Sequence, residues 1–573
     1  MQNIKILWNN LTVFTNDRTQ KKILYNISGK IDTGFTAIMG ASGSGKSTLL
    51  NTLSYRTDPN IKKTGTMQIN GLDYTHSEFK NFGAYVMQKD ILNPDLTVEE
   101  TLYYNAKLKL PNTMSEEQIN EKVSDVIKKM GLNHTKNTII GSSLKKGISG
   151  GECKRLCIAI ELLSNPKLLF LDEPTSGLDT GTASLVCSYL KKISQDGITV
   201  VCTIHQPSQK VFEMFDNVIL LDRGEIVFIG KVLDLNSFFE LSGFGIPLNT
   251  NPADFVIDVI SDQQNSHILK NRFNSFSNDP TNDVNIQFTN EIPIVNRKQT
   301  WFYQFMILVN RSIKEQWRKK YGILTDIINN IIMAFLIGGV FYGIDNSQKN
   351  VFLRSPFLFF CCINQGLSSS LSTVNSFPED RVLSLHERRS GAYKTSAYFM
   401  AKMLVETAVQ TIKPILFSCI VYFMVGLHHD ANNFFIFMAI MILCSMAATS
   451  LALMISAMCK TASLSLKILA ICLEISRLFG GFFLEPARLP KYFAWLDALS
   501  FIKYAFVSVS LNEYKDVVFT CPANTTCQYT TGNQVIELRG YDYITIGGAV
   551  GVLLLFIFFM RFIAYVGLRF NKH

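Results

Sequence analysis

The sequence predicts two domains of different fold class: an α/β domain with a parallel sheet, followed by an all-α membrane domain with six spans. Over roughly the first 230 residues, strand-like runs alternate with helix-like runs, as in a parallel sheet flanked by helices. From about Leu324 onward, long apolar runs alternate with short polar ones. The 573-residue chain is 47% hydrophobic and only 18% charged, which is unusual for a purely soluble protein.

Changes in composition place the domain boundaries. The α/β domain is expected to cover residues 1–261. Residues 262–300 are polar and rich in Asn, Asp and Ser, which predicts a partly disordered linker. The membrane domain then covers 301–573. Its first segment, 301–320, mixes apolar and basic residues as an amphipathic helix at the membrane surface does, and a packed soluble helix is the alternative.

Six apolar windows of the second domain are each close to the ~20 residues that a helical span needs. They lie near 323–344, 352–375, 397–427, 432–458, 463–484 and 543–566. The third window contains Pro414 and is expected to bend there. Prolines also break the apolar start of residues 485–541, which predicts a re-entrant or interfacial segment followed by an outer loop.

Lysine and arginine gather between alternate windows, on one side of the membrane if six spans are present. This distribution predicts an integral, multi-pass membrane protein with the first domain and both termini in the cytosol, in the plasma membrane or an internal one. The N-terminus lacks the apolar core of a signal peptide. The net charge of +9 is modest and many basic residues flank apolar runs, so no nucleic-acid partner is expected.

The polar outer loop holds Cys521 and Cys527 on either side of the sequon Asn524-Thr525-Thr526. Disulfides and N-glycans form in extracytosolic loops, so we expect a Cys521–Cys527 bridge and a glycan on Asn524, with an intermolecular bond as the alternative for the cysteines. Cysteines of the first domain show no zinc-type spacing and are expected to be reduced thiols.

The segment GASGSGKS follows a strand-like run and opens a helix-like run, which is the context of a phosphate-binding loop. Its glycines let backbone N–H groups approach phosphates, and the helix N-terminus favours an anion. The expected nucleotide-binding residues are Gly40, Ala41, Ser42, Gly43, Ser44, Gly45, Lys46, Ser47 and Thr48. Lys46 would bind the β- and γ-phosphates, and the Ser47 hydroxyl would reach Mg²⁺.

Two acidic residues follow the apolar run of LLFLDEP. Asp172 stands at the end of this expected strand, where it would help to hold Mg²⁺. Glu173 comes next, and a carboxylate beside that site can accept a proton from the attacking water. Glu173 is therefore the candidate general base.

The segment ISGGECKR begins a further helix-like run just upstream of the acidic pair. It would offer a hydroxyl and backbone N–H groups to a phosphate through Ser149, Gly150, Gly151 and Glu152. One nucleotide cannot easily use two such loops from one domain. This loop is therefore expected to meet a nucleotide held by a partner subunit.

Together these motifs resemble those of the ATP-binding cassette (ABC) transporters, in which ISGGE is the signature loop. The resemblance implies ATP as the nucleotide and adds three elements. Gln88 in YVMQKD matches the Q-loop, which touches Mg²⁺. Ser176 and Asp179 in SGLD match the D-loop, which contacts the partner domain. His205 in TIHQPS matches the switch histidine, which contacts the γ-phosphate.

The chain also resembles the G, or White, subfamily, whose ATPase domain precedes the membrane domain. The similar segments are ISGGECKR, NPADF, HERRSGAY, YFMVGL, GFF and SFIKYAFVSVSLNEY, and they extend over nearly the whole chain. This resemblance implies six spans and a half-transporter that forms a homo- or heterodimer with two composite ATP sites. It places HERRSGAY on the cytosolic side, where Glu387 and Arg388 are candidates for coupling the ATPase to the spans.

Ionisable groups within a span indicate function by default. Glu406 lies in the third window. Glu474 and Arg477 lie in the fifth, where a spacing of three residues favours an ion pair on one helix face over substrate binding. Asn330 in the first window is expected to bond to a neighbouring helix. Asn364, Gln365 and Leu367 in the second match the central cavity region of the subfamily.

The expected function is ATP-driven export or flipping of a lipidic or amphipathic substrate, such as a sterol, phospholipid, pigment precursor or drug, by a dimer. The direction of transport comes from the resemblance alone. Two alternatives keep the same motifs: a subunit that depends on its partner for catalysis, and a nucleotide-gated channel. A soluble ATPase would also carry these motifs, but the six apolar windows exclude it unless the chain is a fusion.

Overall fold

The computed structural model describes most of the chain. The described residues are 4–18, 20–58, 60–142, 145–247, 249–277, 299–347, 350–428, 430–483, 491–520 and 529–570. The chain divides into two compact units, residues 1–300 with 390–392, and the rest of 301–573. Cys521, Cys527 and Asn524 lie outside the described residues, so the bridge and the glycan stay predictions.

The first unit is built on a six-stranded sheet in the order β10-β9-β3-β8-β7-β6. Its strands are β3 (Phe35–Met39), β6 (Gly83–Val86), β7 (Leu168–Leu171), β8 (Thr199–Thr203), β9 (Asn217–Asp222) and β10 (Glu225–Lys231). All neighbours pair in parallel except β10 with β9. Every residue of β3, β7 and β8 is buried, as expected of parallel strands covered on both faces. The predicted α/β class is confirmed.

Helices surround this sheet, and several begin where the sequence supplies a cap. They are α1 (Lys46–Leu53), α2 (His76–Phe82), α3 (Val98–Lys109), α4 (Glu116–Lys129), α5 (Gly150–Leu162), α6 (Thr180–Gln195), α7 (Gln209–Phe212), α8 (Val232–Leu241), α9 (Pro252–Ser261) and α10 (Gln263–Ser277). Thr75, Thr97 and Ser115 each form a capping box with the Glu or Gln three residues later, which fixes the first turns of α2, α3 and α4.

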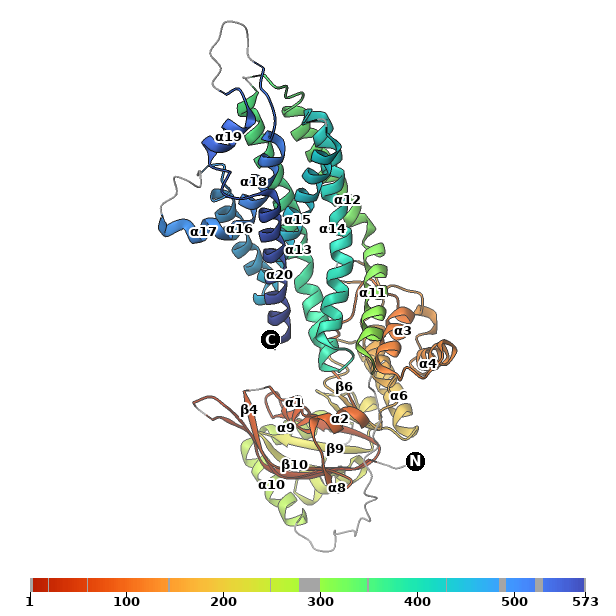
Figure 1. Ribbon diagram of the computed structural model, residues 1–573. Coiled ribbons are helices and arrows are strands. Elements are labelled where there is room, and N and C mark those ends of the chain that lie inside the picture. Colours follow the sequence, from red (N-terminus) through yellow and green to blue (C-terminus); the bar gives the residue numbers. More distant parts are fainter. Residues whose placement is uncertain are drawn as a thin grey trace. The chain divides into compact units, whose positions relative to one another are not determined.

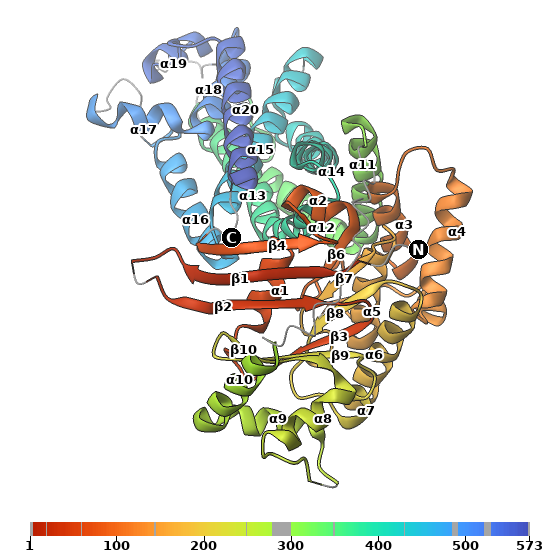
Figure 2. The ribbon, with the colours of Figure 1, turned by 90° about the horizontal axis from the view of Figure 1, so that it is seen from below.

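A second, antiparallel sheet of the first unit has the order β2-β1-β4-β5. Its strands are β1 (Ile6–Thr15), β2 (Lys22–Ile31), β4 (Ile61–Ile69) and β5 (Leu72–Asp73), and Figure 2 shows β4, β1 and β2 side by side. Trp8 from this sheet and Phe170 from the central sheet are fully buried in one apolar cluster. That shared core holds the two sheets together.

Helix α10 extends the first unit past the predicted boundary at residue 261. Leu269 is buried in the core of this unit. The Ser266 hydroxyl donates to the Asp222 carboxylate over 2.7 Å, and Lys270 lies 3.2 Å from the same carboxylate. The first part of the expected linker is therefore a packed helix, because Asp222 at the end of β9 supplies a buried partner for it.

The second unit is helical, and its long helices run alongside one another (Figure 1). They are α11 (Trp301–Arg318), α12 (Lys320–Val340), α13 (Val351–Arg389), α14 (Thr395–Val425), α15 (Ala431–Met458), α16 (Ala462–Leu478) and α20 (Ile546–Phe570). The short helices are α17 (Ala494–Leu499), α18 (Phe501–Tyr514) and α19 (Gly532–Arg539). Helix α14 continues through Pro414.

Five helices of the described residues are long and apolar enough to cross a membrane: α12, α13, α14, α15 and α20. The predicted fifth span is the exception. Its helix, α16, has 17 residues, and at 1.5 Å per residue it is roughly 25 Å long, shorter than a hydrocarbon core of about 30 Å. Residues 484–490, which follow it, are outside the described part. The span predicted near 463–484 therefore stays a prediction.

Helix α11 buries charged side chains and exposes aromatic ones. Its buried side chains include Arg311 and Glu315, while Phe302 and Trp317 are 60% and 76% exposed. The polar groups face the neighbouring α14, where Lys402 lies 3.6 Å from Glu315. An exposed aromatic face suits the apolar edge of a lipid bilayer, which supports the predicted place of this helix at the membrane surface.

Candidate nucleotide site

The predicted phosphate-binding loop joins β3 to α1 at the carboxyl end of the central strand. Gly40 has φ 151°, and a Cβ there would come within 2.1 Å of the Leu221 carbonyl oxygen. Gly45 is left-handed, with φ 99°, and caps α1 without offering a side chain to its amides. The first N–H groups of α1 are thus available to an anion.

Lys46 is the first residue of α1 and is 6% exposed. Its ammonium donates to the carbonyl oxygens of Gly40 and Ala41 over 2.8 and 2.9 Å. Burial lowers the pKa of Lys46, while the carboxylates of Glu173 and Asp172 act in the opposite direction. The charge therefore lies inside the loop, on the side of the acidic pair, where a phosphate chain would need it.

Asp172 joins three elements at the ends of β7 and β8. The Ser47 hydroxyl of α1 donates to Asp172 Oδ1 over 2.8 Å, and the Thr203 hydroxyl donates to the same atom over 2.7 Å. Leu171 pairs with Cys202 in the parallel register, so the next residue on each strand, Asp172 and Thr203, must be neighbours. Thr203 was not among the predicted site residues, although a hydroxyl at the end of a strand beside the acidic strand was a usable signal.

Glu173 follows with φ 46°, a left-handed conformation that is uncommon for a side chain of this kind. Its N–H donates to the Thr203 hydroxyl over 2.8 Å, which holds the turn. The Gln88 amide donates to Glu173 Oε2 over 2.6 Å. The strained turn and the amide together aim the carboxylate at the edge where Ser47 and Asp172 meet.

The Ser47 hydroxyl and the Asp172 carboxylate meet at this edge, and Gln88, whose amide also has an oxygen to offer, is bonded to the adjacent Glu173. Oxygen donors of this kind are what Mg²⁺ prefers, usually with substrate phosphate oxygens completing its shell. The three residues predicted for the metal are therefore close enough in the fold to act together, with Ser47 bonded to Asp172, and Gln88 bonded to the next residue, Glu173.

The ISGGE loop caps α5 at a separate place. Glu152 accepts from the N–H and hydroxyl of Ser149 over 2.7 and 2.8 Å, a capping box. Burial alone would raise the pKa of Glu152, but hydrogen bonds from Ser149 and His134 bring it below its usual value. Ser149 and Gly150 are exposed, whereas a Cβ on Gly151 would lie 2.1 Å from Thr182. Glu152 thus fixes the conformation of the loop, whose residues Ser149 and Gly150 remain exposed at the start of α5.

Comparison with known proteins decides the family. A family model described as ABC transporter matches residues 24–176. Two family models described as ABC-2 type transporter match residues 205–274 and 303–514. Protein white of Drosophila melanogaster is 33% identical, covering 97% of this chain and 85% of that protein. ABC transporter G family member 1 of Dictyostelium discoideum is 31% identical, covering 96% and 82%. The chain belongs to the G family of ABC transporters.

A further relative is the broad substrate specificity ATP-binding cassette transporter ABCG2 of Bos taurus, 31% identical over 96% of this chain and 91% of that protein. As an ABC transporter, the chain binds ATP and couples its hydrolysis to transport across a membrane. The first unit is its ATPase domain and the helical second unit is its membrane domain.

The remaining predicted ATP-site residues of this ABC transporter lie on exposed turns. Asp179 caps α6 by accepting from the Thr182 N–H over 3.0 Å, and Ser176 is exposed beside it. His205 is exposed two residues after Thr203. Among the described residues, no hydrogen bond or ion pair joins the Ser149 loop to the phosphate-binding loop. Contact of these groups with a partner chain stays a prediction.

Lys154 is a functional candidate that the sequence analysis missed. It lies in the second turn of α5, and its side chain is 2% exposed. The ammonium donates to the carbonyl oxygen of Gln88 over 2.8 Å and lies 2.8 Å from the Asp90 carboxylate. One buried charge thus ties the helix of the signature loop to the Q-loop. The signal was a lysine inside ISGGECKR, directly before the buried Arg155.

We expect Lys154→Met to lower kcat for ATP about tenfold or more with a smaller change in KM, because charge-assisted hydrogen bonds contribute about 1.5–3 kcal/mol and this one positions Gln88 rather than the phosphates. Steady-state ATPase of the purified full chain measures both constants. The control is Lys128→Met at an exposed position of α4, which should change neither. An equal rise in KM with unchanged kcat would contradict the positioning role.

The two coupling candidates make bonds within the membrane domain. Arg311 donates to both carboxylate oxygens of Glu387 over 2.8 and 3.0 Å, and the Tyr393 hydroxyl donates to it over 2.6 Å. Arg388 donates to the backbone carbonyl of Leu568 near the end of α20. Glu387 therefore ties the end of α13 to α11, and its role toward the ATPase domain stays a prediction.

Polar residues predicted within the spans have distinct partners. Glu474 and Arg477 form the expected ion pair, with both side chains at least half exposed. The Asn330 amide donates to the Lys413 carbonyl of α14 over 2.8 Å, as expected of a helix-joining group. Gln365 is fully buried and donates to Asn330 over 3.2 Å. Its burial argues against a direct place for Gln365 on a cavity wall.

Proposed function

We propose that this chain is a half-transporter that exports or flips a lipidic or amphipathic compound, and that it works as a dimer with two composite ATP sites. The observation that carries the proposal is the separation of two loops in one ATPase domain. The phosphate-binding loop has its own acidic pair, whereas the capped Ser149 loop is exposed and, within the described part of the chain, makes no hydrogen bond or ion pair to the phosphate-binding loop. A second chain would bring its Ser149 loop to the nucleotide of the first.

The residues of this chain divide the work of hydrolysis. Lys46 and the amides of α1 bind the phosphates, and Glu173 accepts the proton of the attacking water while Gln88 holds its other oxygen. Ser47, Asp172 and Gln88 would hold Mg²⁺, which when bound would supply positive charge against the phosphates. By family resemblance, His205 contacts the γ-phosphate.

A mixing experiment tests the composite sites. Lys46→Met removes the phosphate ligand of the chain that carries it, while Ser149→Ala damages only the site completed on its partner. Homodimers of either variant should have no appreciable ATPase activity. Co-expressed and purified as tagged heterodimers, the two variants should recover activity, because one of the two sites is then intact. If both loops serve the same nucleotide in one chain, mixing will restore nothing.

Substrate class calls for a second measurement. ATPase of the reconstituted protein should be stimulated by amphipathic members of a panel of lipids and drugs, and not by small soluble metabolites. Stimulation only after adding another half-transporter would identify a subunit that depends on its partner. An ATP-dependent ion current in planar bilayers would identify a channel instead, and would overturn the export proposal.

A further inference from the structure

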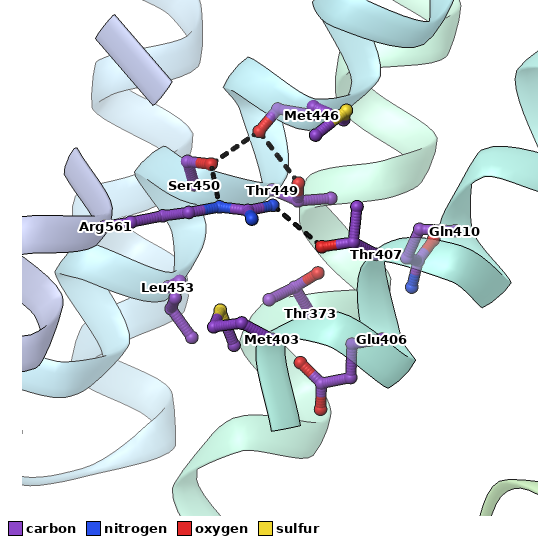
Figure 3. A pocket seen from close by; sticks show the side chains of 10 residues that line it. All are labelled: Thr373, Met403, Glu406, Thr407, Gln410, Met446, Thr449, Ser450, Leu453 and Arg561. Atoms are coloured by element: carbon purple, nitrogen blue, oxygen red, sulfur yellow. Dashed lines mark hydrogen bonds between the residues drawn. The ribbon is translucent and has the colours of Figure 1, made fainter. Parts of the chain in front are cut away.

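A polar pocket lies within the membrane domain among α13, α14, α15 and α20 (Figure 3). It is lined by Thr373, Met403, Glu406, Thr407, Gln410, Met446, Thr449, Ser450, Leu453 and Arg561. Its free volume is about 20 Å³, which is room for one water-sized group. Neither the nucleotide site nor the coupling candidates use this pocket.

Arg561 dominates one side of the pocket. It is the only charged residue of the sequence between Asp542 and Arg569, in the most apolar of the membrane-crossing helices. Figure 3 shows its side chain reaching from α20 between α15 and α14, where it donates to the Ser450 hydroxyl of α15 and the Thr407 hydroxyl of α14 over 3.0 Å each. These bonds use two of the five N–H groups of a guanidinium. Among the described residues, no carboxylate lies within 4.0 Å of it.

Glu406 gives the pocket its opposite charge. It stands on α14 one residue before Thr407, and the ammonium of Lys402, one turn away, lies 3.6 Å from its carboxylate. An anion in the pocket would be repelled by Glu406, and a cation by Arg561. An alkyl group would leave guanidinium N–H groups without partners, which is costly in a membrane. A neutral hydroxyl satisfies both sides, because it accepts from Arg561 and donates to Glu406.

Three lining residues of the pocket extend to the surface of the membrane domain. Arg561, Glu406 and Thr407 are each partly exposed. Their neighbours along the chain include Leu404 on α14 and Phe562 on α20, which are 55% and 54% exposed. Apolar surface of this kind on membrane helices contacts lipid tails. A molecule lying there could extend one polar end between the two helices.

We propose that this pocket is a subsite for the single hydroxyl of an amphipathic molecule, whose apolar body lies in the bilayer against α14 and α20. The size of the pocket admits one hydroxyl and excludes a charged phosphate headgroup. Its transport role rests on the proposed function, but binding at the site does not require ATP. Arg561 and Glu406 are then specificity residues that select a hydroxyl over an ether or a hydrocarbon.

Photolabelling of the full chain in lipid nanodiscs without nucleotide tests the subsite. The probe is hexadecanol carrying a diazirine in its chain, and labelled peptides are mapped by mass spectrometry. We expect labels on α14 and α20, with hexadecanol competing about tenfold better than its methyl ether, since a hydrogen bond to a charged group contributes that much. In Arg561→Met, hexadecanol and its methyl ether should compete equally well. In Glu406→Gln, the preference for hexadecanol over the ether should be smaller than in the wild type.

Arg569→Met is the matched control, because it removes an arginine from the same helix but not from the pocket, and it should keep the tenfold preference. Basal ATPase and a single size-exclusion peak show which variants are folded. If Arg561→Met does not fold, Glu406→Gln still tests the pocket, because it keeps the size of the side chain. Equal competition in the wild type, or a preference that survives in both pocket variants, overturns the proposal. Absence of label on α14 and α20 means that the pocket holds only water. Labelling needs no hydrolysis, so failure of the mixing experiment leaves this result interpretable.

Discussion

Glu173→Gln should bind ATP about as well as the wild type and hydrolyse it at least ~100-fold more slowly, since a positioned general base typically contributes 10²–10⁴. Gln keeps the size of the side chain and can still bond to Gln88. The left-handed turn at this residue is held by the Thr203 hydroxyl through the backbone N–H, which the substitution leaves in place. What is lost is the carboxylate that can take a proton from water.

The measurement pairs ATP binding with turnover on the same preparation, for example a fluorescent ATP analogue and phosphate release. Glu240→Gln on α8 is a suitable control, because it makes the same chemical change at an exposed position of the ATPase domain. Trapped ATP should also hold the two ATPase domains of a dimer together. Near-normal phosphate release from Glu173→Gln would remove Glu173 as the base and direct attention to His205.

The parts of the nucleotide site that the sequence predicted are those encoded locally. A buried strand, a glycine-rich turn and a helix start occur within a few residues around Lys46, and the same holds for Asp172 at the end of β7. Thr203 and Lys154 were missed because their bonds span 31 and 66 residues, to Asp172 and Gln88. Such contacts depend on strand register and helix packing, which no local pattern specifies.

In the membrane domain, too, local sequence patterns predicted the helices but not the contacts between them. Apolar windows predicted five helices that are long enough to cross a bilayer, since hydropathy is a local property. Hydropathy did not reveal that α16 stops at Leu478, nor that α11 turns its charged side chains inward. Both outcomes depend on what lies opposite. Lys402 on α14 and Glu387 on α13 give Glu315 and Arg311 of α11 partners that only the folded chain brings close.

Arg354 is a further residue whose partner is far away in the sequence. In the sequence it stands at the start of the second apolar window, away from the loops where lysine and arginine gather. In the structure it is 3% exposed in the first turn of α13, and its guanidinium donates to Glu513 of α18 over 2.8 Å. The His428 N–H approaches the other carboxylate oxygen over 3.4 Å. Arg354 therefore neutralises a buried acid rather than marking the topology.

We expect Arg354→Met to destabilise the membrane domain by about 3–5 kcal/mol, because Glu513 would be left as a buried and unpaired charge. Glu513→Gln should also destabilise the domain, but by less, because the guanidinium loses its carboxylate and keeps its bonds to Asp345 and Asn346. The double variant Arg354→Met/Glu513→Leu should cost much less than the two single changes together, since it removes both charges at once. Thermal unfolding in detergent, followed by loss of the monodisperse peak, ranks the four proteins.

The control is the exposed pair on α16. Arg477→Met breaks an ion pair whose side chains are 50% and 64% exposed, and should cost less than about 1 kcal/mol. If the double variant at Arg354 and Glu513 loses as much as the sum of the single ones, the pair is not coupled and each group has its own partners. If the coupling is found, the ion pair fastens α13 to α18. The end of α13 that carries Arg354 is then held in place independently of its other end, where Glu387 and Arg388 lie.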